Sequence, residues 1–181
     1  NIEGPSVIRI RAANTAAADE MQFTLTAMRP PILPELRDAV TRLHNPYSRT
    51  VSLVQGTGPV TWQLAAPPAG MTIAHGVIQW PDPQPKDTTR NITVTATNAV
   101  GGDTKSYLLT ILESPVIGPT DDVTVHEGSS LSIQPALSAG SLPVQWKLNS
   151  APAGVTMNPD TGRIAWPRSE EHTSELQSPL C

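Results

Sequence analysis

The chain has 181 residues, a formal net charge of −4 and a single cysteine, Cys181. This near-neutral balance gives no electrostatic basis for binding nucleic acid or an anionic membrane, and one thiol excludes a disulfide framework and a zinc–thiolate site. The 19 prolines and 12 glycines predict many short strands joined by tight turns, and the apolar runs are too short for a transmembrane helix.

Two alternating runs open the chain. Apolar and polar side chains alternate over residues 7–12 and again over residues 21–27, which predicts a β-hairpin. Both runs return later at one constant offset, which matches Ile8 to Ile92, Ile10 to Val94, and Phe23 to Tyr107. We therefore interpret residues 1–30 as the closing hairpin of a preceding repeat whose front is missing.

The first strand after this hairpin is ambiguous. Four residues have the spacing of a helix: Leu36, Ala39, Val40 and Leu43. The equivalent segment one repeat later, residues 123–125, has the sequence Val-Thr-Val and favours a strand. We expect a strand, with a short helix as the alternative. A second strand is expected from Thr50 to Gln55, with Val51 and Leu53 directed inward.

The clearest internal repeat is a longer motif that occurs twice in the chain. Residues 60–81 contain a Trp-x-Leu strand, a Pro-Pro-Ala-Gly turn and an Ile-Gln-Trp-Pro ending, and residues 144–167 follow the same order at the offset of the hairpin. A fixed period, here the step from Trp62 to Trp146, indicates tandem structural repeats, each with about seven short strands. One repeat is complete, residues 31–114, and the next is truncated, residues 115–167.

The same pattern predicts the core. Trp62 lies between Val60 and Leu64 in an alternating strand, so its ring should be almost fully buried between two sheets. Equivalent reasoning gives the full set of expected core residues: Trp62, Trp80, Trp146, Trp166, Leu64 and Leu148. Gly70 and Gly154 end the Pro-Ala-Gly turns, where glycine can supply a positive φ.

These motifs resemble a known family. The segment Pro-Ala-Gly-Met-Thr-Ile, followed by Gly-Val-Ile-Gln-Trp-Pro and Ile-Thr-Val-Thr-Ala-Thr-Asn, is similar to the immunoglobulin-like repeats of large bacterial surface and secreted proteins, relatives of the dystroglycan-type cadherin-like domains. The resemblance implies an all-β fold of tandem immunoglobulin-like β-sandwiches, one complete and two partial. It also implies a non-catalytic spacer or adhesion module of a long extracellular or cell-surface protein, with neighbouring repeats as its partners. The alternatives are a module that binds a surface glycan or a protein, and an accessory arm of a secreted hydrolase.

Few residues suggest a chemical site. The cadherin-like relatives bind calcium at domain junctions, and the candidates here are Asp103, Asp121 and Asp122, which form no acidic cluster. The histidines lack the spacing of metal ligands. The sequence contains no nucleophile elbow, phosphate loop or paired-carboxylate motif. We therefore expect no enzymatic activity and no cofactor, with calcium as the alternative.

The C-terminal residues differ from the rest of the chain. Residues 168–178 resemble the translated read of a common sequencing adapter, and the repeat stops at Pro167. Segments of this origin are left out of fold reasoning. We expect residues 168–181 to be an artefactual, disordered tail that packs on nothing.

Overall fold

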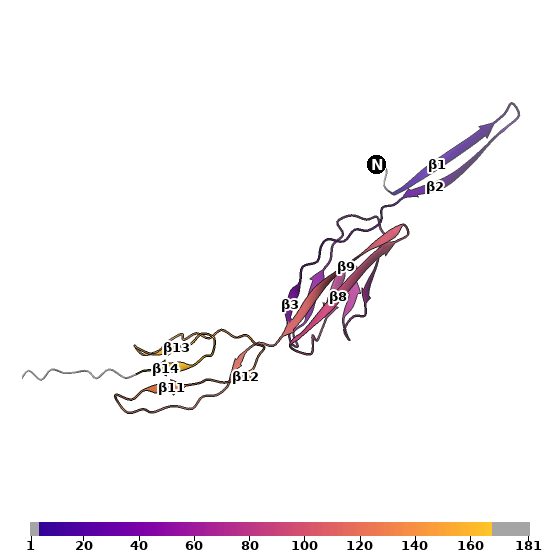
Figure 1. Cartoon of the computed structure of the whole chain (residues 1–181). Helices are drawn as coiled ribbons and strands as arrows, with labels where there is room; N and C mark the ends of the chain where they lie inside the picture. The colour runs from indigo at the N-terminus through magenta and orange to yellow at the C-terminus, as the bar shows by residue number, and fades with distance from the viewer. Residues whose placement is uncertain (1–3, 168–181) are drawn as a thin grey trace, which may run out of the picture. The chain divides into compact units, whose positions relative to one another are not determined.

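A computed structural model describes residues 4–167 and shows an all-β chain (Figure 1). The chain forms 14 strands in this range, and no residue of the range is helical. The described residues divide into two compact units, the first ending at Leu112 and the second beginning at Glu113. Between residues 4 and 167 there is accordingly no helix with the length and apolarity needed to cross a membrane. The prediction for residues 168–181 lies outside the described range.

The first unit opens with the predicted hairpin. β1 (Gly4–Ala13) and β2 (Ala18–Ala27) pair antiparallel along their whole length. Asn14 closes the turn, because its Oδ1 accepts hydrogen bonds from the backbone N–H groups of Ala16 (2.8 Å) and Ala17 (2.9 Å). Most side chains of both strands are exposed, including large apolar ones.

The rest of the first unit is a two-layer sandwich. One sheet has four strands in the order β3 (Ala39–Arg42), β9 (Gly101–Leu112), β8 (Thr88–Asn98) and β5 (Thr61–Ala65). The other sheet has three strands in the order β4 (Tyr47–Thr50), β7 (Val77–Trp80) and β6 (Thr72–Ala74). β3 pairs parallel with β9, and all other neighbours are antiparallel. The expected strand, rather than a helix, is therefore confirmed as β3.

The second strand of the repeat lies earlier than expected. The prediction of a strand from Thr50 to Gln55 is wrong, because β4 ends at Thr50. Val51 still donates its N–H to the carbonyl oxygen of Gly76 (2.7 Å), but the chain then leaves β7. Further along, the N–H of Val54 donates to the carbonyl oxygen of Ile32, and the N–H of Ile32 donates to that of Gln55, both at 2.8 Å. Residues 54 and 55 therefore pair with Ile32, near the start of the repeat, instead of extending the pairing of β4 with β7.

The core lies between the two sheets and follows the alternation of their strands. Its buried side chains come from both layers: Ile78 and Trp80 from β7, Ile92, Val94 and Ala96 from β8, and Tyr107, Leu109 and Ile111 from β9. Trp80 is 2% exposed, and its indole Nε1–H donates to the carbonyl oxygen of Ala69 (3.1 Å). The largest side chain of the core is therefore buried with its polar atom satisfied.

Trp62 differs from Trp80, because it is only half-buried. It lies on β5, an edge strand of the four-stranded sheet, and packs against the core together with Leu64, which is also half-buried. The prediction that Trp62 is almost fully buried is therefore wrong. The physical reason is that β5 has a neighbouring strand on one side alone, so the other side of the ring stays accessible.

The second unit repeats the smaller of the two sheets. Its three strands are β11 (Leu131–Ile133), β14 (Ile164–Trp166) and β13 (Thr156–Met157), in the order of β4, β7 and β6. Leu131 pairs with Trp166 as Tyr47 pairs with Trp80 in the first unit. A separate two-stranded sheet joins β10 (Val116–Ile117) to β12 (Leu137–Ala139).

The larger sheet is not formed in the second unit. The counterparts of β3 and β5 are residues 123–126 and 145–149, and neither segment is a strand. In the first unit β3 pairs with β9, and β5 pairs with β8. Up to residue 167 the second unit contains no counterpart of β8 or β9. An extended segment without a hydrogen-bonded neighbour is not stable as a strand, which explains the difference. No hydrophobic side chain described in this unit is fully buried, and the expected core residues Trp146, Leu148 and Trp166 are half-buried.

Candidate functional site

The feature that recurs in both units is a polar junction at the start of each repeat. In the first unit the backbone N–H of Arg29 donates to Thr57 Oγ1 and the N–H of Thr57 donates to the carbonyl oxygen of Arg29, both at 3.1 Å. In the second unit the equivalent residues, Glu113 and Ser141, make the same two bonds at 2.8 Å and 3.0 Å. Each junction thus fixes the residue that enters the repeat to a loop within it.

A glycine beside each junction allows this close approach. Gly56 has a φ of 145°, and a Cβ atom there would lie 2.8 Å from the Cα of Pro31. Gly140 has a φ of 129°, and a Cβ atom there would lie 2.7 Å from the Cα of Pro115. A side chain at either glycine would push the entering proline away, so the junction requires glycine at this position.

Asn98, at the tip of the β8–β9 hairpin, completes the first junction. Its Nδ2 donates to the carbonyl oxygens of Arg29 (2.6 Å) and Thr57 (2.9 Å), while its Oδ1 accepts from the N–H of Val100 (3.0 Å). One side chain therefore joins the hairpin tip to both segments of the junction. The closing hairpin of the repeat and its entry are held at the same end of the sandwich.

Asp103 ties the same hairpin to the entering chain. Its Oδ2 accepts a hydrogen bond from the N–H of Leu33 (2.8 Å), and its Oδ1 accepts from the N–H of Thr104 (2.8 Å). Leu33 is buried, so this carboxylate helps to position a core residue. The loop from Asn98 to Asp103 thus uses both of its end side chains inside the repeat.

We expect Asn98→Ala to lower the free energy of unfolding of the first unit by about 1–3 kcal/mol, because two carbonyl oxygens lose their shared donor. The measurement is urea unfolding followed through the amide signals of β8 and β9. Asn91→Ala is the matched control, since Asn91 is an exposed residue of the same strand. Equal losses in the two variants would show that the junction bonds contribute no stability.

Two tyrosines connect the two sheets. The hydroxyl groups of Tyr47 on β4 and Tyr107 on β9 lie 3.1 Å apart, and the Arg49 guanidinium lies 4.0 Å from the centroid of the Tyr107 ring. Burial raises the pKa of Tyr107 well above its usual value, and the bond to Tyr47 raises it further. Tyr107 therefore stays neutral and serves as a hydrogen-bonded link between the layers rather than as an acid or base.

The candidate calcium ligands belong to different units. Asp103 is held by the bonds to Leu33 and Thr104, whereas Asp121 and Asp122 are exposed in a loop of the other unit. Across residues 4–167 no group of three or more His, Cys, Asp or Glu side chains is arranged to hold a metal ion. A hard cation such as calcium requires six to eight oxygen ligands, and neither Asp103 nor the pair Asp121 and Asp122 belongs to such a group among the described residues.

A shallow groove lies beside Trp62 on the sandwich. Its volume is about 460 Å³, and it is lined by β5, β6 and the turn between them, through Trp62, Gln63, Leu64, Pro67, Met71, Thr72 and Ile73. The lining contains no acidic or basic side chain. Gly70, which ends the adjoining turn, has the predicted positive φ of 79°, and its counterpart Gly154 has 81°.

Sequence reasoning placed equivalent junctions at residues 28–31 and 113–115, but it missed the loop residues that bond to them. Arg29, Gly56 and Thr57 have counterparts one repeat later that keep their roles: Glu113, Gly140 and Ser141. Arg29 and Glu113 make the paired junction bonds through their backbone groups, and the Glu113 side chain adds a bond of its own, because its Oε2 accepts from the N–H of Gly140 (3.0 Å). A glycine followed directly by a hydroxyl residue, Gly56-Thr57 in one repeat and Gly140-Ser141 in the next, was the signal that could have located these loop residues.

Neither a protein-family model nor a curated protein matches the chain. Among solved structures, the chain is similar to the eight N-terminal Ig domains of Down Syndrome Cell Adhesion Molecule, with 14% identity and a TM-score of 0.57 over 93% of this chain and 28% of that one. It is also similar to extracellular domains 3–5 of OTK from Drosophila, with 15% identity and a TM-score of 0.57 over 91% of this chain and 61% of that one. An I-band fragment of titin is 15% identical, with a TM-score of 0.51 over 92% of this chain and 65% of the fragment. The chain thus spans less than two thirds of each of these structures, and the similarities show its fold, a tandem of immunoglobulin-like domains.

Proposed function

We propose that this chain is a non-catalytic spacer segment of a long extracellular or cell-surface protein, built from tandem immunoglobulin-like repeats. Residues 31–114 form the complete repeat, and residues 1–30 and 115–167 belong to its neighbours. The motifs that resemble bacterial, cadherin-like surface repeats support this role. Two of the similar structures support it as well, because one is a cell adhesion molecule and the other consists of extracellular domains.

The parallel pairing of β3 with β9 is the observation that carries this proposal. β3 lies near the start of the repeat, and β9 ends it at Leu112. Because the two strands run parallel, tension between the entry and exit of the repeat pulls them past each other along their length. All hydrogen bonds between β3 and β9 then resist the force together, as a spacer under tension requires.

A pair of proline variants on β3 tests this role. The N–H of Leu43 donates to the carbonyl oxygen of Leu112 (2.8 Å), so by alternation the N–H of Thr41 also faces β9 and that of Val40 faces away. We expect Thr41→Pro to lower the force at which the first unit unfolds when the chain is stretched between its ends. Val40→Pro, which leaves the ladder intact, is expected to keep most of that force.

Single-molecule stretching of the 181-residue chain is the measurement. The sequence of unfolding events identifies the first unit by its greater released length. Equal unfolding forces in the two proline variants, or a first unit that opens without a distinct event, would contradict the mechanical role of β3.

A further inference from the structure

We propose that the groove beside Trp62 binds a neutral glycan, with the indole ring against one face of a sugar and neutral side chains bonded to its hydroxyl groups. This inference goes beyond the spacer function and does not depend on it. It rests on residues of the first unit alone. The groove lies between β5 and β6, each of which forms one edge of its sheet.

The first observation is an accessible hydrogen-bond donor on the wall of the groove. Trp80 donates its indole N–H to the carbonyl oxygen of Ala69, whereas the indole N–H of Trp62 has no partner among residues 4–167. In the same range, no buried side-chain nitrogen or oxygen atom of a buried or half-buried residue lacks a partner. The Trp62 N–H is therefore accessible, and it is available to a ligand that occupies the groove.

The ring of Trp62 is held in place from within the sandwich. It packs against the core cluster, and a Cβ atom at Gly76 would lie 3.1 Å from its Cζ2 and 3.3 Å from its Cη2. Glycine at this corner thus lets the backbone approach the inner edge of the ring closely. A ring that is fixed before binding loses little conformational freedom when a ligand contacts it, which favours binding.

Two neutral polar side chains line the same groove from its two bordering strands. Gln63 on β5 and Thr72 on β6 are both exposed, and neither side chain hydrogen-bonds to another residue in the described part of the chain. The amide of Gln63 and the hydroxyl of Thr72 can each donate and accept a hydrogen bond. A ligand that lies between β5 and β6 therefore meets free polar groups on both sides.

The charge of the groove restricts the class of ligand. Among the described residues that line it, none has an acidic or basic side chain. A charged ligand would lose part of its hydration in the groove without gaining an ionic partner there. This argues against nucleotides, phosphorylated molecules and anionic glycans. The lining instead complements a ligand that carries no charge.

The shape of the groove restricts the class further. Its volume of about 460 Å³ accommodates a small ligand, but the groove is shallow and leaves one side of that ligand in water. A wholly apolar ligand such as an acyl chain gains little there, because much of its surface stays exposed. A sugar ring meets both conditions. Its C–H groups form an apolar face for the indole, and its hydroxyl groups bond to water and to the free polar side chains.

An extended peptide paired with β5 or β6 is the main alternative occupant. However, β5 has only five residues and is followed by Ala66, with a φ of 43°, and by Pro67 and Pro68. β6 has only three residues. Edges this short, and one of them bounded by proline, resist the addition of another strand. Recognition therefore depends on the side chains of the groove, which favours a glycan.

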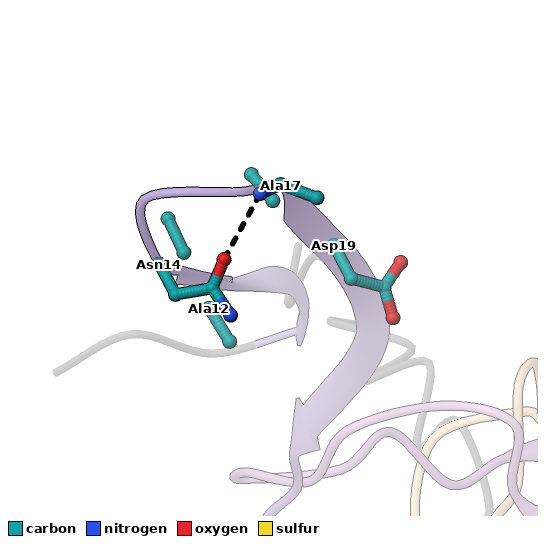
Figure 2. A pocket seen from close by; sticks show the side chains of 6 residues that line it. Ala12, Asn14, Ala17 and Asp19 are labelled. Atoms are coloured by element: carbon teal, nitrogen blue, oxygen red, sulfur yellow. Dashed lines mark hydrogen bonds between the residues drawn. The ribbon is translucent and has the colours of Figure 1, made fainter.

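The hollow at the tip of the β1–β2 hairpin lacks these features. Figure 2 shows Asn14 and Asp19 beside it, with the Asn14 Oδ1 engaged in the bond to Ala17 that closes the turn. Its other described lining residues are alanines, so none of them provides a ring on which a sugar can stack. Asp19 adds a charge. This hollow therefore does not match a neutral glycan.

Native electrophoresis of the 181-residue chain through gels that contain a neutral polysaccharide tests the proposal. The probes are dextran, galactomannan and mixed-linkage β-glucan, and a gel without polysaccharide gives the reference mobility. We expect at least one probe to retard the chain, and Gln63→Ala to weaken this binding roughly three- to tenfold, the effect of one lost hydrogen bond. Gln55→Ala is the matched control, because Gln55 is an exposed glutamine outside the groove. A chain that none of the three probes retards, or equal weakening by the two substitutions, would overturn the proposal.

Two-dimensional NMR locates the bound glycan independently. The indole N–H signal of Trp62, identified by its absence from Trp62→Phe, is expected to shift when an oligosaccharide of the retarding polysaccharide is added. The indole signal of Trp80 is the internal control, since its N–H is bonded to Ala69 inside the sandwich. Trp62→Phe keeps an aromatic ring at this position, so the identification does not require a variant with a large cavity. Binding that leaves the Trp62 signal unchanged would refute the assignment of the glycan to this groove.

Discussion

Trp80→Ala is expected to lower the free energy of unfolding of the first unit by about 3–5 kcal/mol. The side chain is 2% exposed and belongs to the cluster that joins both sheets, so its removal leaves a cavity that the surrounding strands cannot fill. The carbonyl oxygen of Ala69 also loses its indole donor. A domain of this size has a total stability of roughly 4–12 kcal/mol, so the substitution removes a large share of it. Urea unfolding followed through the amide signals of β8 measures the loss.

Trp62→Ala is the matched control for this prediction. It removes the same ring from a half-buried position on the edge strand β5, where less apolar surface is lost from the core and water can enter the space. We therefore expect a smaller loss than for Trp80→Ala. If Trp62→Ala proved the more damaging of the two, the burial of Trp80 could not be the main source of core stability.

The closing hairpin was predictable from the sequence because its signal is local. Alternation over residues 7–12 and 21–27 predicted β1 and β2, and the internal repeat predicted that β8 and β9 share their register. The same repeat correctly favoured a strand over a helix at β3. In each case the decisive pattern was the side-chain period of an extended strand, which is visible without tertiary information.

Features that depend on neighbouring strands could not be predicted in this way. Alternation placed Trp62 on an inward face, but its exposure is set by the position of β5 at the edge of a sheet. Residues 145–149 have a sequence pattern similar to β5, yet they form no strand where the described unit lacks a counterpart of β8. The loop partners of the junction were missed for a related reason, because Arg29 binds Thr57 through backbone groups that its side chain does not reveal.

Gly76→Ala is expected to destabilise the first unit by about 3 kcal/mol or more, through two separate effects. Gly76 has a φ of 79°, where a residue with a Cβ atom is disfavoured by about 1–2 kcal/mol. A Cβ atom would also lie 2.5 Å from the carbonyl oxygen of Val51 and 3.1 Å from Cζ2 of Trp62. The backbone of Val51 is fixed by its own hydrogen bond to Gly76, just beyond the ends of β4 and β7. Relief of the clash would strain this bond, which costs roughly a further 1–3 kcal/mol.

Gly70→Ala isolates the backbone effect, which makes the pair of variants decisive. Gly70 has the same φ of 79°, but a Cβ atom there meets no heavy atom within 4 Å. We expect its loss to be only the conformational cost, so urea unfolding should place Gly76→Ala at least about 1 kcal/mol below Gly70→Ala in stability. In the second unit a Cβ atom at Gly162 would lie 2.6 Å from the ring of Trp146, which extends the same glycine–tryptophan contact to the next repeat. Equal losses at Gly70 and Gly76 would mean that φ alone selects glycine at this corner, and that the close approach to Trp62 and Val51 has no energetic consequence.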